Sequence, residues 1–199
     1  VFSLGPDAGI GGTQKFNFGL KDENIFGTAS KFGASIFFDG KRTPHVGYSA
    51  DLLQRNIKGS FINWNLGFKT YNNAFNSNRN EESFYYMRFE KPLVTQYLQW
   101  LGALEMSYNK TRNGYLSDSL YYSDYRYSFY NIDGWIAYNF GEKKIRHTGV
   151  KSTVRKFIAL RAFNQHFLKA PDKTTLNYDG TYSNSRGLLS SFTFFKQNF

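Results

Sequence analysis

The chain has 199 residues, no cysteine and a formal net charge of +10, and aromatic residues make up 20% of it. This composition excludes a disulfide scaffold, a Cys-ligated zinc or iron–sulfur site and a disordered chain. No stretch approaches the ~20 consecutive apolar residues of a membrane-spanning helix. The mean hydropathy is −0.53. A polar average combined with many aromatics is typical of a membrane β-barrel, whose strands have one face in lipid and the other in water.

Alternation of apolar and polar residues predicts β-strands from the beginning of the chain. Within residues 15–21, Phe16, Phe18 and Leu20 share one face. The dipeptide Asp39-Gly40 predicts a hairpin turn after the next strand. We expect roughly nine or ten strands, each close to the ~9 to 11 residues that cross a bilayer at a tilt. The further alternating segments are 31–39, 46–52, 62–68, 85–89, 98–108, 125–140, 157–167 and 188–195.

The connections between these segments are expected to differ in length. The short turns are predicted at residues 22–24, 39–40 and 91–92. The long loops, rich in Asn, Ser, Asp and Tyr, are predicted at residues 72–82, 113–124 and 170–184. Short turns at one end and long loops at the other are typical of outer-membrane barrels. The sequence therefore predicts an all-β fold, an antiparallel transmembrane β-barrel that forms a single domain over residues 1–199.

A soluble β-sandwich is the alternative fold, because its strands also alternate. It would have fewer large aromatics on its exposed face and strands of about five or six residues. In a membrane barrel, aromatics near strand ends are expected to form belts at the two membrane–water interfaces. The residues predicted for these belts are Tyr71, Trp100, Tyr108, Trp135 and Tyr138.

Residues 19–28 read Gly-Leu-Lys-Asp-Glu-Asn-Ile-Phe-Gly-Thr. They resemble the strand–turn–strand segment of the BamA/TamA-type outer-membrane assembly superfamily, where a strand ends in Asp-x-Asn, an apolar pair, Gly and a small residue. The side chains of Asp22 and Asn24 can cap this turn, Phe26 belongs to the apolar pair, and Gly27 can supply a positive φ. Segments that also resemble this superfamily, including its surface-antigen branch, are 88–102, 131–136 and 161–171.

The resemblance implies a barrel of about sixteen strands, so we interpret this chain as part of one. It also implies location in the outer membrane of a Gram-negative bacterium. The implied partners are unfolded outer-membrane protein clients and accessory lipoproteins, and the implied function is their insertion, assembly or translocation. In that family an incoming strand adds to an early strand at a weak seam. Here the seam strand is expected within residues 1–12, where three glycines pack poorly: Gly9, Gly11 and Gly12.

The sequence offers no constellation for catalysis. His45, His147 and His166 lack metal-ligand spacing, and no Gly-x-Ser-x-Gly motif is present. We therefore expect no enzymatic activity, no cofactor and no metal site. Two further functions stay open, namely a passive pore or membrane-anchor barrel for a separate enzyme or binding domain, and a soluble β-rich adhesin.

The basic surplus is concentrated in residues 143–156. Basic residues near aromatics are also found in nucleic-acid-binding proteins, but no nucleic-acid-binding motif accompanies these. Beside long alternating strands, the expected partners are anionic outer-membrane lipids and lipopolysaccharide, and no nucleic acid.

Overall fold

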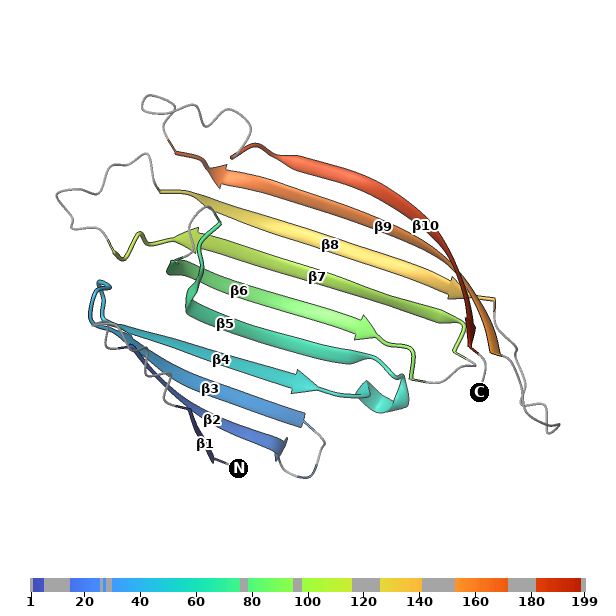
Figure 1. Cartoon of the computed structure of the whole chain (residues 1–199), viewed down its shortest axis with the longest axis horizontal. Coiled ribbons are helices and arrows are strands. Elements are labelled where there is room, and N and C mark those ends of the chain that lie inside the picture. The colour runs from blue at the N-terminus through green and yellow to red at the C-terminus, as the bar shows by residue number, and fades with distance from the viewer. Residues whose placement is uncertain are drawn as a thin grey trace.

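The computed structural model describes residues 2–5, 15–25, 27, 30–75, 79–94, 98–115, 126–140, 153–171 and 182–197. They form one antiparallel sheet of ten strands, ordered in space as they are in the chain (Figure 1). The strands are β1 (Phe2–Gly5), β2 (Lys15–Ile25), β3 (Ser30–Asp39), β4 (Val46–Gln54), β5 (Asn63–Asn73), β6 (Asn80–Lys91), β7 (Trp100–Thr111), β8 (Ser128–Asn139), β9 (Thr153–Lys169) and β10 (Ser185–Gln197). The prediction of an all-β antiparallel fold is confirmed.

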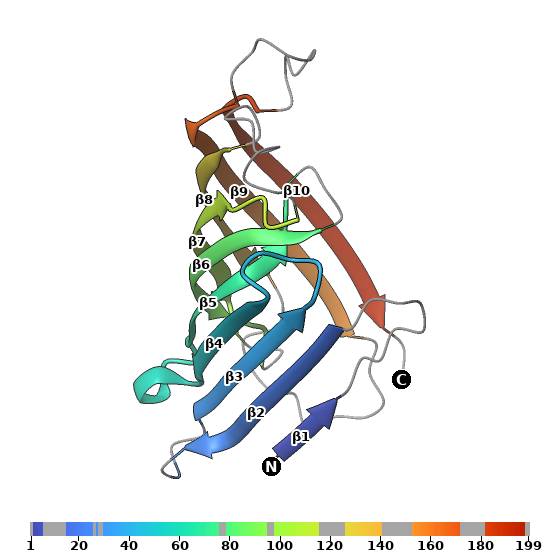
Figure 2. The same ribbon diagram turned by 90° about the vertical axis from the view of Figure 1, so that its left-hand side faces the viewer.

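The sheet is an open, curved wall. From β2 onward its strands are long, from nine residues in β4 to 17 in β9, whereas β1 has four. Strands β1 and β10 are the two edges and each pairs with one neighbour. Seen edge-on, the sheet twists and bends, and β1 and β10 approach the same side of it (Figure 2). Within the described residues, the helical structure is a single 3-10 turn at Ile57–Gly59.

The first predicted turn, at residues 22–24, is wrong. These residues continue β2, which pairs with β3 as far as Ile25 and Ser30 across a register shift. Residue Asn24 donates its backbone N–H to Asp22 Oδ1 at 3.0 Å, and Gly27 donates to Asn24 O at 3.2 Å with a φ of +71°. The Asp22 side chain thus caps a backbone N–H and Gly27 has a positive φ, whereas Asn24 contributes backbone groups to these two hydrogen bonds. Phe26 lies outside the described residues.

The tight hairpin predicted at Asp39-Gly40 is a wider loop over residues 40–45. Asp39 donates its backbone N–H to His45 O at 2.9 Å, and its side chain accepts the N–H of Lys41 at 3.0 Å. The Asp39 carboxylate therefore caps the beginning of a loop that is longer than a two-residue turn.

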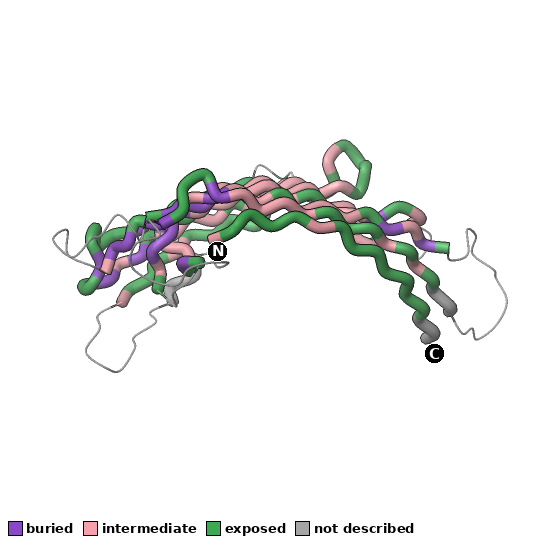
Figure 3. Tube along the Cα trace, turned by 90° about the horizontal axis from the view of Figure 1, so that it is seen from above, coloured by how far each residue is buried: buried purple, intermediate pink, exposed green. Residues whose placement is uncertain are grey.

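Strand alternation divides the connections between the two ends of the sheet. The ends of β3, β5, β7 and β9 and the beginnings of β4, β6, β8 and β10 lie at one end of the sheet, which we call the long-loop end, and the other termini of these strands lie at the opposite end. The three predicted long loops begin at strand ends on this side, but the predicted loop at 72–82 is shorter, because β5 continues to Asn73 and β6 begins at Asn80. The predicted short turn at 91–92 is longer, since β7 begins only at Trp100, and a long connection also follows Asn139 at the opposite end. The expected division into short turns and long loops is therefore only partly present. Buried residues gather mainly at the long-loop end (Figure 3).

Candidate functional site

One face of the sheet is apolar across its width, and we call it the apolar face. Along its middle, six strands from β3 to β8 contribute directly paired side chains. These residues are Phe32, Leu52, Leu66, Met87, Met106 and Ile132. Many residues of this face are half exposed, including Phe16 at 52%, Ile36 at 54% and Ile136 at 50%. Nothing among the described residues covers them.

Aromatic side chains border the apolar face at both strand ends. Toward the long-loop end, Phe68, Tyr85 and Tyr108 have successive ring centroids 6.2 and 6.3 Å apart, and Tyr130 lies 5.2 Å from His166. Toward the opposite end, the Tyr138 ring lies 4.9 Å from each of two neighbouring rings, those of Trp100 and Phe140. The residues between the two borders are aliphatic or small, among them Gly102, Leu104, Gly134, Ile136 and Leu160. Two aromatic borders around an aliphatic band are typical of membrane barrels.

The apolar band crosses the sheet on a diagonal. Leu20 in β2 and His166 in β9 belong to one row of cross-strand partners, which passes through Ala34, Ala50, Phe68, Tyr85, Tyr108 and Tyr130. The band is centred on Phe18 in β2, two residues from this row toward the long-loop end. In β9 it is centred on Leu160, six residues from the row toward the opposite end.

This displacement measures the angle between the strands and the band. The band moves eight residues over the seven steps from β2 to β9. That is about 3.9 Å along the strand for every ~4.8 Å step between strands, which corresponds to a tilt of about 40°. Transmembrane β-barrels have strand tilts of about 35–45°.

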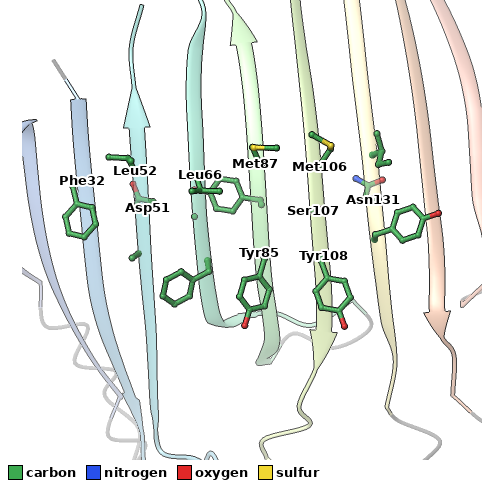
Figure 4. Close-up of a pocket in the computed structure, with 16 residues that line it drawn as sticks. Phe32, Asp51, Leu52, Leu66, Tyr85, Met87, Met106, Ser107, Tyr108 and Asn131 are labelled. Carbon is green, nitrogen blue, oxygen red and sulfur yellow. The ribbon is translucent and has the colours of Figure 1, made fainter. Parts of the chain in front are cut away.

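A shallow groove of about 710 Å³ lies in the middle of the apolar face (Figure 4). Phe32, Leu66, Met87 and Met106 line it together with Tyr85, Tyr108 and neighbouring residues. The hydroxyl groups of Tyr85 and Tyr108 point away from the methionines, toward the long-loop end (Figure 4). An amphipathic ring with its hydroxyl directed outward is the arrangement found at a membrane–water boundary.

Three of the five predicted interfacial aromatics lie on the apolar face, namely Trp100, Tyr108 and Tyr138. The other two do not share that face. Tyr71 stacks on Phe37 at 4.7 Å and is hydrogen-bonded to Ser49 Oγ at 3.2 Å. Trp135 is the cross-strand partner of Arg161. Proximity to a strand end does not decide which face a side chain is on, whereas an odd or even position along the strand does. The same alternation identifies four aromatics of the apolar face that were not predicted: Phe68, Tyr85, Tyr130 and Phe140.

The second face, which we call the polar face, carries charged pairs. Arg88 lies 3.2 Å from Glu90 and 3.6 Å from Glu105. Arg161 binds both carboxylate oxygens of Asp133, with Nε to Oδ1 at 2.8 Å. Glu105 and Asp133 are direct cross-strand partners. Each acid forms an ion pair with an arginine of the next strand, Glu105 with Arg88 of β6 and Asp133 with Arg161 of β9. Ionised groups at this density require water on the polar face.

Residues 112–115, which we call the strap, contact the loop after β3. Thr43 donates its N–H to Gly114 O at 2.5 Å, and the Tyr115 hydroxyl donates to Asp39 Oδ2 at 2.8 Å. Asp39 is fully buried and also lies 3.4 Å from Lys15 Nζ. Burial, together with the bond to Asp39, raises the pKa of Tyr115 to about 12. The strap therefore links β7 to strands that lie three and four places away in the sheet.

A fully buried arginine supports this contact. Arg42 donates to Thr70 O and, at 3.4 Å, to Pro44 O, and its side chain packs beside Gly114 and Gly47. Loss of hydration lowers the pKa of its guanidinium below the usual value.

An aromatic cluster closes another part of the long-loop end. The ring of Phe75 contacts Tyr127 and Phe129 edge-on at 6.3 and 5.4 Å, and Phe167 at 5.6 Å. Its backbone N–H donates to Glu82 Oε1 at 2.8 Å and to the Tyr127 hydroxyl oxygen at 2.9 Å. Burial, reinforced by the hydrogen bond to Glu82, raises the pKa of Tyr127. The connection after β5 is thus fixed by one buried carboxylate and its aromatic surroundings.

Strand β1 forms the N-terminal edge of the described sheet and pairs with β2 over Asn17 to Leu20. The predicted seam glycines, Gly9, Gly11 and Gly12, lie outside the described residues.

No family model, no curated protein and no solved structure matches this chain. Of the helical structure described, nothing is long and apolar enough to cross a membrane. The described part of the chain also contains no group of three or more His, Asp or Glu side chains arranged to hold a metal ion. The two faces of the sheet are therefore the features from which a function can be inferred.

Proposed function

We propose that this chain forms part of the wall of a transmembrane β-barrel in an outer membrane. The apolar face contacts lipid, and the polar face lines a water-filled interior. The observation that carries this proposal is the diagonal apolar band, bordered by aromatics at both strand ends and tilted by about 40° to the strands.

The energetics of the apolar face support the same reading. Burial of one large apolar side chain is worth about 1.5–3 kcal/mol, and this face presents a contiguous row of them on every strand from β2 to β8. Soluble proteins rarely expose contiguous apolar patches of this kind. A soluble sandwich would need a second layer over Ile36, Leu66 and Ile136, and the described residues supply none.

Cysteine labelling tests the assignment of the faces, because the chain has no cysteine of its own. Met106 and Ser107 are neighbours on opposite faces of β7, so Met106→Cys and Ser107→Cys form a matched pair. In membranes, a water-soluble maleimide should label Ser107→Cys and leave Met106→Cys unlabelled, while unfolding in detergent should expose both. Equal labelling of the two variants in intact membranes would refute the proposal.

Insertion of polypeptides is the activity that we assign to this wall, on the resemblance of residues 19–28 to the BamA/TamA-type superfamily. The resemblance implies that an extended client strand adds to an early strand of the barrel by β-augmentation.

A photocrosslinking residue at Glu23, an exposed position of β2, tests this activity. It should capture an outer-membrane protein client during assembly, whereas the same residue at Glu105 on the polar face of β7 should not. Equal capture at both positions would contradict insertion at an early strand.

A passive pore is the second candidate, and the charged row of the polar face favours it. A pore also needs an open interior. The strap and the Phe75 cluster bring described residues of different connections into contact at the long-loop end, which argues against a wide opening there. Conductance in planar bilayers separates the candidates, since a pore passes ions without any client and an insertion barrel assembles clients.

A further inference from the structure

The border of the apolar band toward the long-loop end is basic on strands β7 to β10. Lys110 follows Tyr108 in β7 on the same face, and Arg186 precedes Leu188 in β10. On β9, His166 lies just outside the band, and Lys169 lies further out. The side chains of Lys110, Lys169 and Arg186 are exposed. We call these four residues the basic rim.

The strand pairing brings members of the rim together. Lys110 and Lys169 are both cross-strand partners of Ser128, so they stand in one row across β7, β8 and β9. Two strand spacings separate their backbones, which is about 10 Å. The register shift between Ser128 and Phe129 sets this pairing, because a bulge re-aims the side chains beside it.

Because the band is tilted, Lys110 and Arg186 follow the same border although they differ in register. Arg186 pairs with Asn164, which lies just outside the band in β9. From β7 to β10 the border therefore shifts along the strands toward the opposite end of the sheet, and the residues of the basic rim shift with it.

Within the described positions of the apolar face on β7 to β10, no Asp or Glu is present to neutralise the rim. The acids of these strands, Glu105 and Asp133, lie on the polar face and pair there with Arg88 and Arg161. The described part of the rim is therefore positively charged beside the apolar band, and the Tyr108 hydroxyl points toward the same end of the sheet (Figure 4).

We propose that the basic rim binds the phosphorylated headgroup of an outer-leaflet lipid whose acyl chains lie on the apolar band. This inference rests on the proposed function, because it needs the band to be in lipid. The lysines and the arginine pair with phosphate oxygens, and tyrosine and serine hydroxyls of the border supply further hydrogen bonds. The spacing of Lys110 and Lys169 suits a headgroup with two phosphates.

The test is a titration of the intact protein, in neutral detergent, with lipid A as the probe, followed by native mass spectrometry. The test variant combines Lys110→Gln, Lys169→Gln and Arg186→Gln. The matched control removes the same charge from the polar face through Lys21→Gln, Lys31→Gln and Lys69→Gln. One cation near a phosphate contributes about fivefold to binding, so a headgroup that reaches two of them should lose on the order of 25-fold in the rim variant. The control should retain the wild-type Kd within about twofold.

Each other outcome overturns the inference. An unchanged Kd in the rim variant would do so, as would an equal loss in the control, which would indicate a general effect of net charge. Displacement of lipid A by equimolar inorganic pyrophosphate would show a phosphate site without a role for the acyl chains. The proposed wall is tested independently in phosphatidylcholine vesicles, where a brominated acyl chain should quench Trp100. Quenching of Trp100 with an unchanged Kd refutes the rim alone, and absence of quenching refutes the wall and the rim together.

Discussion

Leu20 and His166 lie in the same cross-strand row of the sheet, yet Leu20 is the last residue of the apolar band in β2 and His166 lies beyond the other border of the band in β9. A sheet whose strands are tilted in a flat slab of lipid must displace its apolar residues steadily from strand to strand, because the boundary of the slab is level and the strands are not.

This relationship predicts effects of different size for one substitution at two positions of that row. Ala50 lies inside the band, between Tyr48 and Leu52, whereas His166 lies outside it. Ala50→Lys should destabilise the folded protein by about 2–4 kcal/mol, and His166→Lys by about 0–1 kcal/mol, because the cost of a charge on the lipid face depends on depth. Urea titrations in phospholipid vesicles measure both. Similar costs at the two positions would mean that the band does not follow the membrane.

Glycines of the sheet provide a test of packing. A Cβ on Gly102 would lie 2.7 Å from the Trp135 carbonyl oxygen, whereas a Cβ on Gly19 would meet nothing closer than 3.7 Å. Gly102→Ala should therefore reduce the free energy of unfolding by about 1–3 kcal/mol. Gly19→Ala, the matched control, should be neutral or mildly stabilising, because glycine weakens a strand interior. The same urea titration decides, and an unchanged Gly102→Ala variant would contradict the close approach of β7 and β8.

High pH should release the strap. The pKa of Tyr115 is raised from 10.0 to about 12, so the folded state holds this proton more tightly than the unfolded state does. The contribution of Tyr115 to stability is therefore complete below about pH 10 and is lost as the pH rises toward 12. Hydrogen exchange of residues 112–115 should accelerate across this range in the wild type. In Tyr115→Phe, exchange should be faster at neutral pH and should lack this step, and an identical step in the variant would assign it to another group.

The buried carboxylate of Glu82 should contribute more to the free energy of unfolding than the more exposed carboxylate of Glu90 in the same strand. Glu82 is 2% exposed and accepts hydrogen bonds from the Phe75 N–H and the Tyr127 hydroxyl, so Glu82→Ala leaves the buried Tyr127 hydroxyl without its acceptor. A cost of about 1–3 kcal/mol is expected. Glu90, whose partner Arg88 is partly exposed, is the control, and Glu90→Ala should cost less than about 1 kcal/mol. Proteolysis within residues 74–79 should increase in the first variant alone, and equal sensitivity of both would contradict the role assigned to Glu82.

Strands and faces were predictable from the sequence because a period of two is a local signal. Phe16, Phe18 and Leu20 reveal their shared face without any knowledge of the rest of the chain. The face of Tyr71 and Trp135 was recoverable from the same parity, which the prediction did not apply to them. The diagonal of the band is different, because it depends on which residue of β2 pairs with which of β3, and pairing register is a property of two segments together.

The contacts between the strap and the loop after β3 were not predictable. Asp39 and Tyr115 are 76 positions apart, and neither residue has a sequence context that marks the other as its partner. The extension of β2 beyond Asp22 had the same cause, since the polar run Asp22-Glu23-Asn24 is typical of a turn and continues as a strand only because β3 pairs with it.

The three tryptophans test the central claim most directly. Trp64 and Trp100 lie on the apolar face and Trp135 on the polar face. Single-tryptophan variants made by Trp→Phe substitution should be reconstituted in vesicles of brominated phosphatidylcholine. Strong quenching of Trp64 and Trp100, with Trp135 quenched instead by aqueous iodide or acrylamide, is the predicted result. Quenching of Trp135 by the brominated lipid, or protection of Trp64 and Trp100 from it, would show that the apolar face does not contact the membrane.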